Sequence, residues 1–184
     1  MLVLDADLRL PLEGPQAAEP AAVLGWSVRL LLCHLTHTST EHALLTGLGL
    51  ALLWPALGGS WRHRALNCCA RACLTSVLLL AHKLVLGTGW PGTHYAGASG
   101  ILHGLWIRMS LIWLKQSPGH AALMACTLLG KLLLDFSVER TTADGTLVTP
   151  IAHLYGALAG MALGLGQQCH RRHGEPGLTQ PFDQ

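Results

Sequence analysis

The most informative run of this sequence reads Tyr95-Ala96-Gly97-Ala98-Ser99-Gly100-Ile101-Leu102-His103-Gly104. It joins a polar, glycine-rich loop to an apolar stretch and places a serine between small residues at that junction. Residues four apart share one face of a helix, so we expect His103 one turn below Ser99 and Gly104 one turn below Gly100. The run therefore predicts a helix that begins near Ser99, with reactive groups on one face and a neighbouring face that another backbone can approach closely.

The composition is that of a helical membrane protein. Of the 184 residues, 51% are hydrophobic and only 12% are charged, whereas soluble domains carry about 25% charged residues. The formal net charge of +2 is small and scattered, so nothing suggests a nucleic-acid partner, and the lipid bilayer is expected instead. The six cysteines lie mostly in apolar stretches without a disulfide-framework or zinc spacing, so we expect packing residues, and we expect no metal or cofactor.

One compact unit fits the length of the chain. We expect a polar N-terminal tail or outer loop at residues 1–20, a membrane domain at 21–169 and a cytoplasmic tail at 170–184. Residues 21–36 are apolar but shorter than the about 20 residues that a span needs, so we interpret them as an interfacial or re-entrant segment. The remainder predicts an all-α, polytopic bundle of about five spans. They cover residues 42–58, 66–86, 97–114, 120–137 and 148–169.

Basic residues mark three of the connections. Arg62 and Arg64 follow the first of these spans, Lys115 follows the third, and Arg171 and Arg172 lie in the C-terminal tail. Of the two intervening connections, residues 87–96 carry no charge and residues 138–147 are net acidic. Under the positive-inside rule the basic connections are expected on the cytoplasmic side.

This orientation brings three polar residues to one level. His42, Ser99 and His153 each lie near the start of a span that then runs from the outer to the inner face. Helix N-termini carry free N–H groups and positive dipole ends, which favour a developing oxyanion and keep a histidine neutral enough to act as a base. The residues alone thus favour serine nucleophile chemistry near the outer face of a membrane.

Three separated runs carry a resemblance to a known family. They are His37-Thr38-Ser39-Thr40-Glu41-His42-Ala43-Leu44-Leu45-Thr46, the serine run already quoted, and Ala152-His153-Leu154-Tyr155-Gly156-Ala157-Leu158-Ala159-Gly160. In this order they resemble the histidine-rich entry to the second span, the serine motif and the last-span A-H-x-x-G-x-x-x-G of rhomboid intramembrane serine proteases. The extended serine motif is similar to that of the bacterial rhombosortase branch. The likeness covers about residues 24–168.

The resemblance implies a Ser-His dyad with no third acid. Ser99 would attack the scissile carbonyl, and His153 would take its proton and pass it to the leaving amine. The oxyanion would be held by the Ser99 backbone N–H and by the His42 side chain. Thr46 would add a weak hydrogen bond, because it stands where many rhomboids have asparagine. His103 stands where relatives often carry a ring that stacks on the base histidine, so it is given a supporting role.

Glycines are expected to support this site through helix packing. Gly100 and Gly104 follow the serine, and Gly156 and Gly160 follow His153, each pair four residues apart. Such stripes let two helices pack at close range, which would bring Ser99 against His153. Gly97 belongs to the loop that leads into the serine.

Two further features concern charge and the start of the chain. Lys131 and Asp135 have i,i+4 spacing inside a predicted span, so we expect a structural ion pair within the membrane. Trp26 and Arg29 resemble the Trp-Arg element of the long outer loop that follows the first rhomboid span. The resemblance therefore implies that this chain begins after that first span.

The predicted function is intramembrane serine endopeptidase activity at the outer side of the bacterial inner membrane. Its substrates would be single-span membrane proteins, and the rhombosortase resemblance implies C-terminal Gly-Gly-type anchors of exported proteins. One alternative is a catalytically silent rhomboid-like protein that binds membrane segments. Another is a haem-binding bundle that uses His103 and His153 as axial ligands. A zinc protease is disfavoured because the sequence contains no H-E-x-x-H motif.

Overall fold

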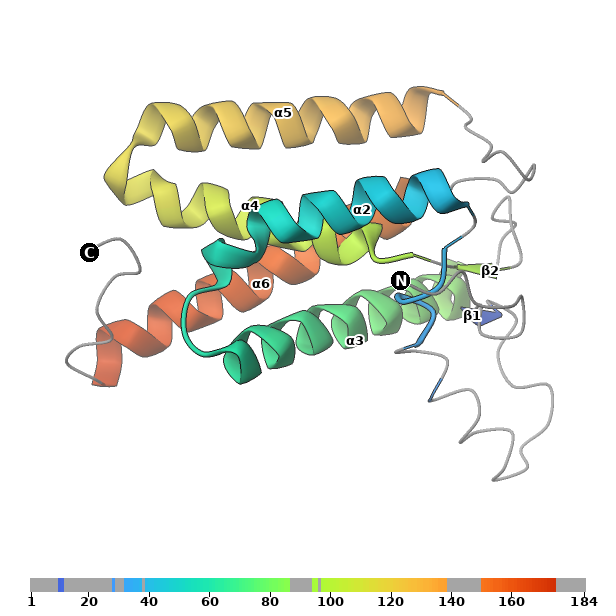
Figure 1. The fold of residues 1–184 in the computed structure, drawn as a ribbon, viewed down its shortest axis with the longest axis horizontal. Coiled ribbons are helices and arrows are strands. Elements are labelled where there is room, and N and C mark those ends of the chain that lie inside the picture. The colour runs from blue at the N-terminus through green and yellow to red at the C-terminus, as the bar shows by residue number, and fades with distance from the viewer. Residues whose placement is uncertain are drawn as a thin grey trace.

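The fold is a bundle of α-helices. The structure, a computed structural model, describes residues 10–11, 28, 32–37, 39–86, 94–95, 97–138 and 150–174. Within these residues it contains five α-helices, one 3₁₀ helix and two strands of two residues each (Figure 1). The helices are α2 (Thr40–Leu53), η2 (Trp54–Leu57), α3 (Trp61–Leu86), α4 (Ser99–Gln116), α5 (Pro118–Ser137) and α6 (Pro150–Gly174). The expectation of an all-helical protein is confirmed for this part of the chain, and each predicted span corresponds to a helix.

Local sequence signals set where the helices begin. Ser39 is the N-cap of α2, and its side chain accepts a hydrogen bond from the His42 backbone N–H at 3.1 Å. Proline occupies the first position of both α5 and α6, where its missing N–H has no helical partner to lose. Pro55 lies shortly after the last residue of α2, and Gly58, whose φ of 60° suits glycine, caps the end of η2.

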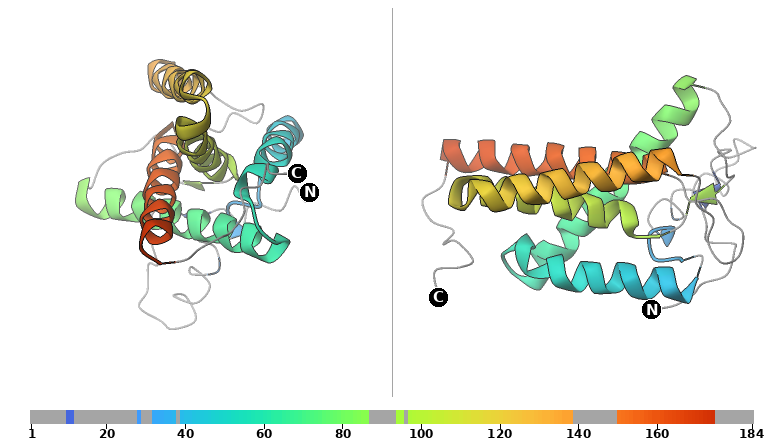
Figure 2. Two further views of the ribbon diagram at one scale, coloured as in Figure 1. Left: turned by 90° about the vertical axis from the view of Figure 1, so that its left-hand side faces the viewer. Right: turned by 90° about the horizontal axis from the view of Figure 1, so that it is seen from above.

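Helix α4 lies at the centre of the bundle and contacts α2, α3, α5 and α6 (Figure 1). Its largest interface is with α6, and α3 is inclined to these helices (Figure 2). Figure 1 also shows that α2, α4 and α6 all begin at the same end of the bundle, where α5 ends. The sequence prediction that three helix N-termini lie at one level agrees with this arrangement.

Glycines permit the close approach of α4 and α6. A Cβ added at Gly156 would lie 2.0 Å from the Gly100 carbonyl oxygen, and one at Gly160 would lie 2.1 Å from the Gly104 carbonyl oxygen. No side chain fits at those distances, so the two backbones are in direct contact. The predicted packing role of these four glycines is confirmed by this geometry.

Among the residues that the structure describes, two helices are long and apolar enough to cross a membrane. These are the Trp61–His82 part of α3 and the whole of α5, Pro118–Ser137. Only 33% and 22% of their apolar windows are buried in the protein, so most of this apolar surface faces outward, unlike the core helix of a soluble domain. Helix α2 has only 14 residues, and α4 and α6 carry the polar groups and glycines of the site, which lowers their hydropathy.

The N-terminal region is described in part. Leu32–Leu35 forms a turn, closed by a 2.9 Å hydrogen bond from the Leu35 N–H to the Leu32 carbonyl. Strand β1 (Leu10–Pro11), which lies in the region predicted as a polar tail, pairs antiparallel with β2 (His94–Tyr95). Trp26, Arg29 and most of the two predicted tails lie outside the described residues, although α6 continues to Gly174, past the tail boundary predicted at residue 170.

Candidate active site

Ser99 is the first residue of α4, held there by the preceding loop. Gly97 has a φ of 113°, a backbone conformation that favours glycine, and its N–H donates to the Cys33 carbonyl at 2.8 Å. The turn through Ala98 then starts the helix, whose first inter-turn bond runs from the Leu102 N–H to the Ala98 carbonyl at 3.0 Å. The serine side chain is therefore buried at a helix N-terminus, in a fixed position.

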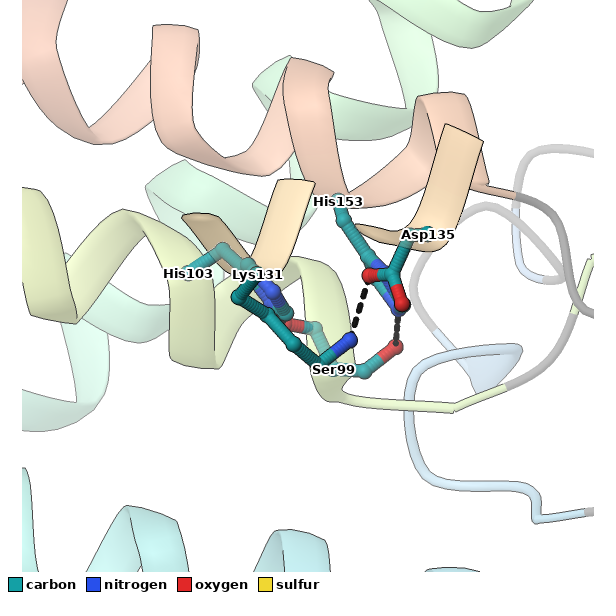
Figure 3. Close-up of polar contacts among 5 residues, drawn as sticks. All are labelled: Ser99, His103, Lys131, Asp135 and His153. Carbon is teal, nitrogen blue, oxygen red and sulfur yellow. Dashed lines mark hydrogen bonds and ion pairs between the residues drawn. The ribbon is translucent and has the colours of Figure 1, made fainter. Parts of the chain in front are cut away.

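His153 lies against Ser99, as the sequence predicted. It belongs to the first turn of α6, and its Nε2 is 3.0 Å from the Ser99 Oγ (Figure 3). Both side chains are buried. The hydroxyl donates to Nε2 when the imidazole carries its proton on Nδ1, which is the state in which the ring can accept the serine proton.

Asp135 contacts the other nitrogen of the His153 ring. Its Oδ2 accepts a hydrogen bond from the His153 Nδ1–H at 2.8 Å, and the same oxygen forms an ion pair with Lys131 (Figure 3). The predicted Lys131–Asp135 pair is confirmed. The resemblance implied a Ser-His dyad with no third acid, whereas the structure places the Asp135 carboxylate at the second ring nitrogen of His153.

The sequence held one signal for Asp135 that the prediction did not use. An ionisable residue inside a predicted membrane span marks function by default. Its i,i+4 relation to Lys131 suggested a purely local explanation instead. Asp135 and His153 are 18 positions apart in the sequence, and no pattern joined them.

His103 supports His153 from the side. Its ring is stacked on that of His153, with centroids 4.2 Å apart and planes at 7°. Its Nδ1 donates to the Ser99 carbonyl at 2.7 Å, which fixes the ring one turn below the serine. The predicted stacking position of His103 is confirmed.

His42 and Thr46 lie on α2, and His42 is close to Gly97. A Cβ added at Gly97 would lie 2.9 Å from the His42 Cε1, so the glycine makes room for this ring just ahead of the serine. The edge of the His42 ring also contacts His37, with centroids 5.3 Å apart. Thr46 is buried one turn further along α2. Their roles as oxyanion donors stay predictions.

The geometry of this cluster bears on metal and haem binding. Donor atoms of His103, Asp135 and His153 lie within 4.8 Å of one another, a spacing compatible with a metal ion. The two imidazole planes are stacked and nearly parallel, however, so one ion cannot lie in both planes, where the nitrogen lone pairs point. The stacked rings also do not suit two axial ligands on opposite sides of a haem iron. The donor set fits a hydrogen-bonded proton relay better than either.

Comparisons with protein-family models, with curated proteins and with solved structures find no match for this chain. Its function is therefore inferred from residues and their geometry. A serine hydroxyl bonded to an imidazole, which is bonded in turn to a carboxylate, is the arrangement in which serine acts as a nucleophile.

Proposed function

We propose that this protein is a serine endopeptidase of the rhomboid type, similar to the rhombosortase branch, with Ser99 as nucleophile and His153 as general base. The observation that carries the proposal is the 3.0 Å contact between the Ser99 Oγ and the His153 Nε2 at a buried helix N-terminus. A serine that only capped its own helix would have no need of a buried histidine from α6.

The reaction follows from these positions. As the Ser99 Oγ attacks the scissile carbonyl carbon, the His153 Nε2 takes the hydroxyl proton. The tetrahedral intermediate collapses with cleavage of the C–N bond, and the imidazolium passes its proton to the leaving amine. Water then attacks the acyl-serine ester with His153 again acting as base, which releases the new carboxylate and restores Ser99.

The oxyanion would lie at the start of α4. The Ser99 backbone N–H belongs to the first helical turn, where N–H groups have no helical acceptor and the helix dipole is positive. The His42 side chain adds a second donor from α2, beside the glycine loop. Removal of one such donor typically costs about 10²–10³ in kcat.

The proposed setting is the bacterial inner membrane, with the site toward its outer side. Support comes from the two apolar helices, from their outward-facing leucines and from the basic connections that the positive-inside rule assigns to the cytoplasm. A substrate would be a single-span protein that enters laterally and unwinds locally, since a helical backbone hides its carbonyls. Glycine lowers this unwinding cost by up to about 1 kcal/mol per residue relative to alanine.

A membrane-anchored reporter tests the proposal. It would carry a C-terminal Gly-Gly motif, one apolar span and a basic cluster, and it would be co-expressed with the native protein, Ser99→Ala or His153→Ala. We expect release by the native protein alone, and less release when leucine replaces the reporter's glycines. Equal release by Ser99→Ala would refute the protease assignment. Cleavage of an unrelated span but not of this reporter would refute only the narrower rhombosortase assignment.

A further inference from the structure

We infer that Asp135 is the positioning residue of His153, and that Lys131 anchors its carboxylate for that task. The inference rests on the proposed function of Ser99 and His153 and deepens it by adding a third member to the site. Asp135 would hold the imidazole in the tautomer that accepts the serine proton, and its charge would stabilise the imidazolium formed during the reaction.

The first step is the geometry of the hydrogen bond. The 2.8 Å contact from the His153 Nδ1 to the Asp135 Oδ2 leaves Nε2 as the only ring nitrogen available to Ser99, at 3.0 Å. A carboxylate accepts but does not donate, so the proton must sit on Nδ1. The three groups therefore form one chain in which each contact fixes the role of the next.

The second step is the placement of Asp135 on its helix. It lies three residues after Leu132 and seven after Leu128, on the face of α5 that packs into the bundle. These two leucines form a cluster with Ala157 of α6, and the Trp106 Nε1–H of α4 donates to the Met124 carbonyl of α5 at 3.0 Å. Helix α5 thus presents the carboxylate to His153 from a fixed, packed face rather than from a surface loop.

The third step is the charge balance. The Asp135 side chain is 2% exposed, and burying a lone carboxylate would be costly. Lys131 reduces that cost from one helical turn away, and its side chain is 38% exposed. Both partners bind Oδ2, while the buried Oδ1 has no hydrogen-bond partner among the described residues. A lysine partner alone does not explain why this carboxylate turns into the bundle, whereas orientation of His153 does.

The competing explanation is that Asp135 only ties α5 to α6. A purely structural tie would change stability without changing the protonation behaviour of the reaction. The two explanations therefore differ in the pH dependence of turnover. Among the described residues, the titratable groups that surround His153 are Asp135 and Lys131 on α5, His103 on α4 and His42 on α2.

The experiment compares full-length variants in proteoliposomes with the anchored reporter. For Asp135→Asn we expect kcat to fall by about 10²–10⁴ with KM nearly unchanged, and the acidic limb of the kcat–pH profile to move to lower pH, because the imidazolium loses its anion. Lys131→Met keeps the carboxylate, so its kcat should fall by no more than about tenfold. Thr127→Val is the matched control on α5, because Thr127 is exposed and bonds only carbonyls of its own helix.

Three outcomes separate the possibilities. Native kcat and an unchanged pH profile in Asp135→Asn, with Ser99→Ala inactive, would overturn the inference and leave the proposed function intact. Equal losses in Asp135→Asn and Lys131→Met, with the pH profile unmoved, would favour the structural tie and also overturn it. A native protein that neither cleaves nor reacts at Ser99 would instead refute the proposed function.

A second measurement does not depend on the folding of an Asp135 variant. In protein labelled with ¹⁵N-histidine, the Nδ1 proton of His153 should give a downfield resonance, because it is buried and bonded to a carboxylate. His153→Ala identifies the signal by its loss. The absence of any such resonance in the native protein would overturn the inference.

Discussion

Replacement of Gly156 by alanine should separate Ser99 from His153. The added methyl would lie 2.0 Å from the Gly100 carbonyl oxygen and 2.5 Å from its carbonyl carbon. Carbon–oxygen contacts in helix interfaces are about 3.3–3.6 Å, so α4 and α6 must move apart by more than about 1 Å at this level. His153 lies one turn before Gly156 on α6, and the 3.0 Å contact with Ser99 would exceed hydrogen-bond length.

The expected loss can be estimated from this displacement. A misplacement of about 1 Å at a catalytic group costs on the order of 10² in rate. Overpacking of a close interface also destabilises a protein by about 1–3 kcal/mol. We therefore expect Gly156→Ala to lower kcat on the anchored reporter by about a hundredfold and to lower the thermal unfolding midpoint by several degrees.

Gly166→Ala is the control on the same helix. Nothing lies within 4 Å of a Cβ at Gly166, so alanine there should leave kcat unchanged and should favour the helix by up to about 1 kcal/mol. Native kcat in Gly156→Ala, with membrane insertion and expression matched, would refute the claim that direct backbone contact of α4 and α6 sets the Ser–His distance.

Three further predictions concern histidines around the site. His42→Ala should slow reporter cleavage by about 10²–10³, as for an oxyanion donor, and native kcat would remove His42 from the reaction. His103→Ala should lower kcat by up to about tenfold, because a stacked aromatic pair is worth about 0.5–1.5 kcal/mol, and His103→Phe should restore most of the rate if stacking is the cause. Burial lowers the pKa of His34 to about 4 from its ordinary 6.5, so the unfolded segment binds a proton more readily than the folded one. The stability that neutral His34 contributes is therefore full above pH 6.5 and is lost as the pH falls toward 4. Hydrogen exchange of residues 32–37, corrected for its intrinsic pH dependence, should rise across that window, and constant protection would contradict this prediction.

Much of the helical framework was predictable from local sequence. Apolar runs between polar connections gave five helices, and residues with cap or proline signals, such as Ser39 and Pro150, lie at or next to their starts. The four-residue glycine repeats predicted the α4–α6 contact and, through it, the approach of Ser99 to His153. These features follow from periodicity and from residue size, which a sequence displays directly.

Features that depend on the rotation of one helix against another were not predictable. The contact of Asp135 with His153 requires α5 to turn its inner face toward α6, and the apolar residues of α5 do not specify that rotation. The same limit applies to Arg108 of α4, whose Nη2 donates to the Leu57 carbonyl of η2 at 3.1 Å. The two-residue pairing of β1 with β2 was also missed, because a strand that short and containing Pro11 has no periodic signal.

The central claim is that His153 activates Ser99 as a nucleophile. A fluorophosphonate reacts only with a serine whose hydroxyl is activated, so it tests that claim without any knowledge of the substrate. We predict labelling of the native protein at Ser99, mapped by mass spectrometry, with no labelling in Ser99→Ala and a loss of about 10²-fold or more in the labelling rate of His153→Ala. An unlabelled native protein, or labelling that persists at full rate in His153→Ala, would contradict the claim.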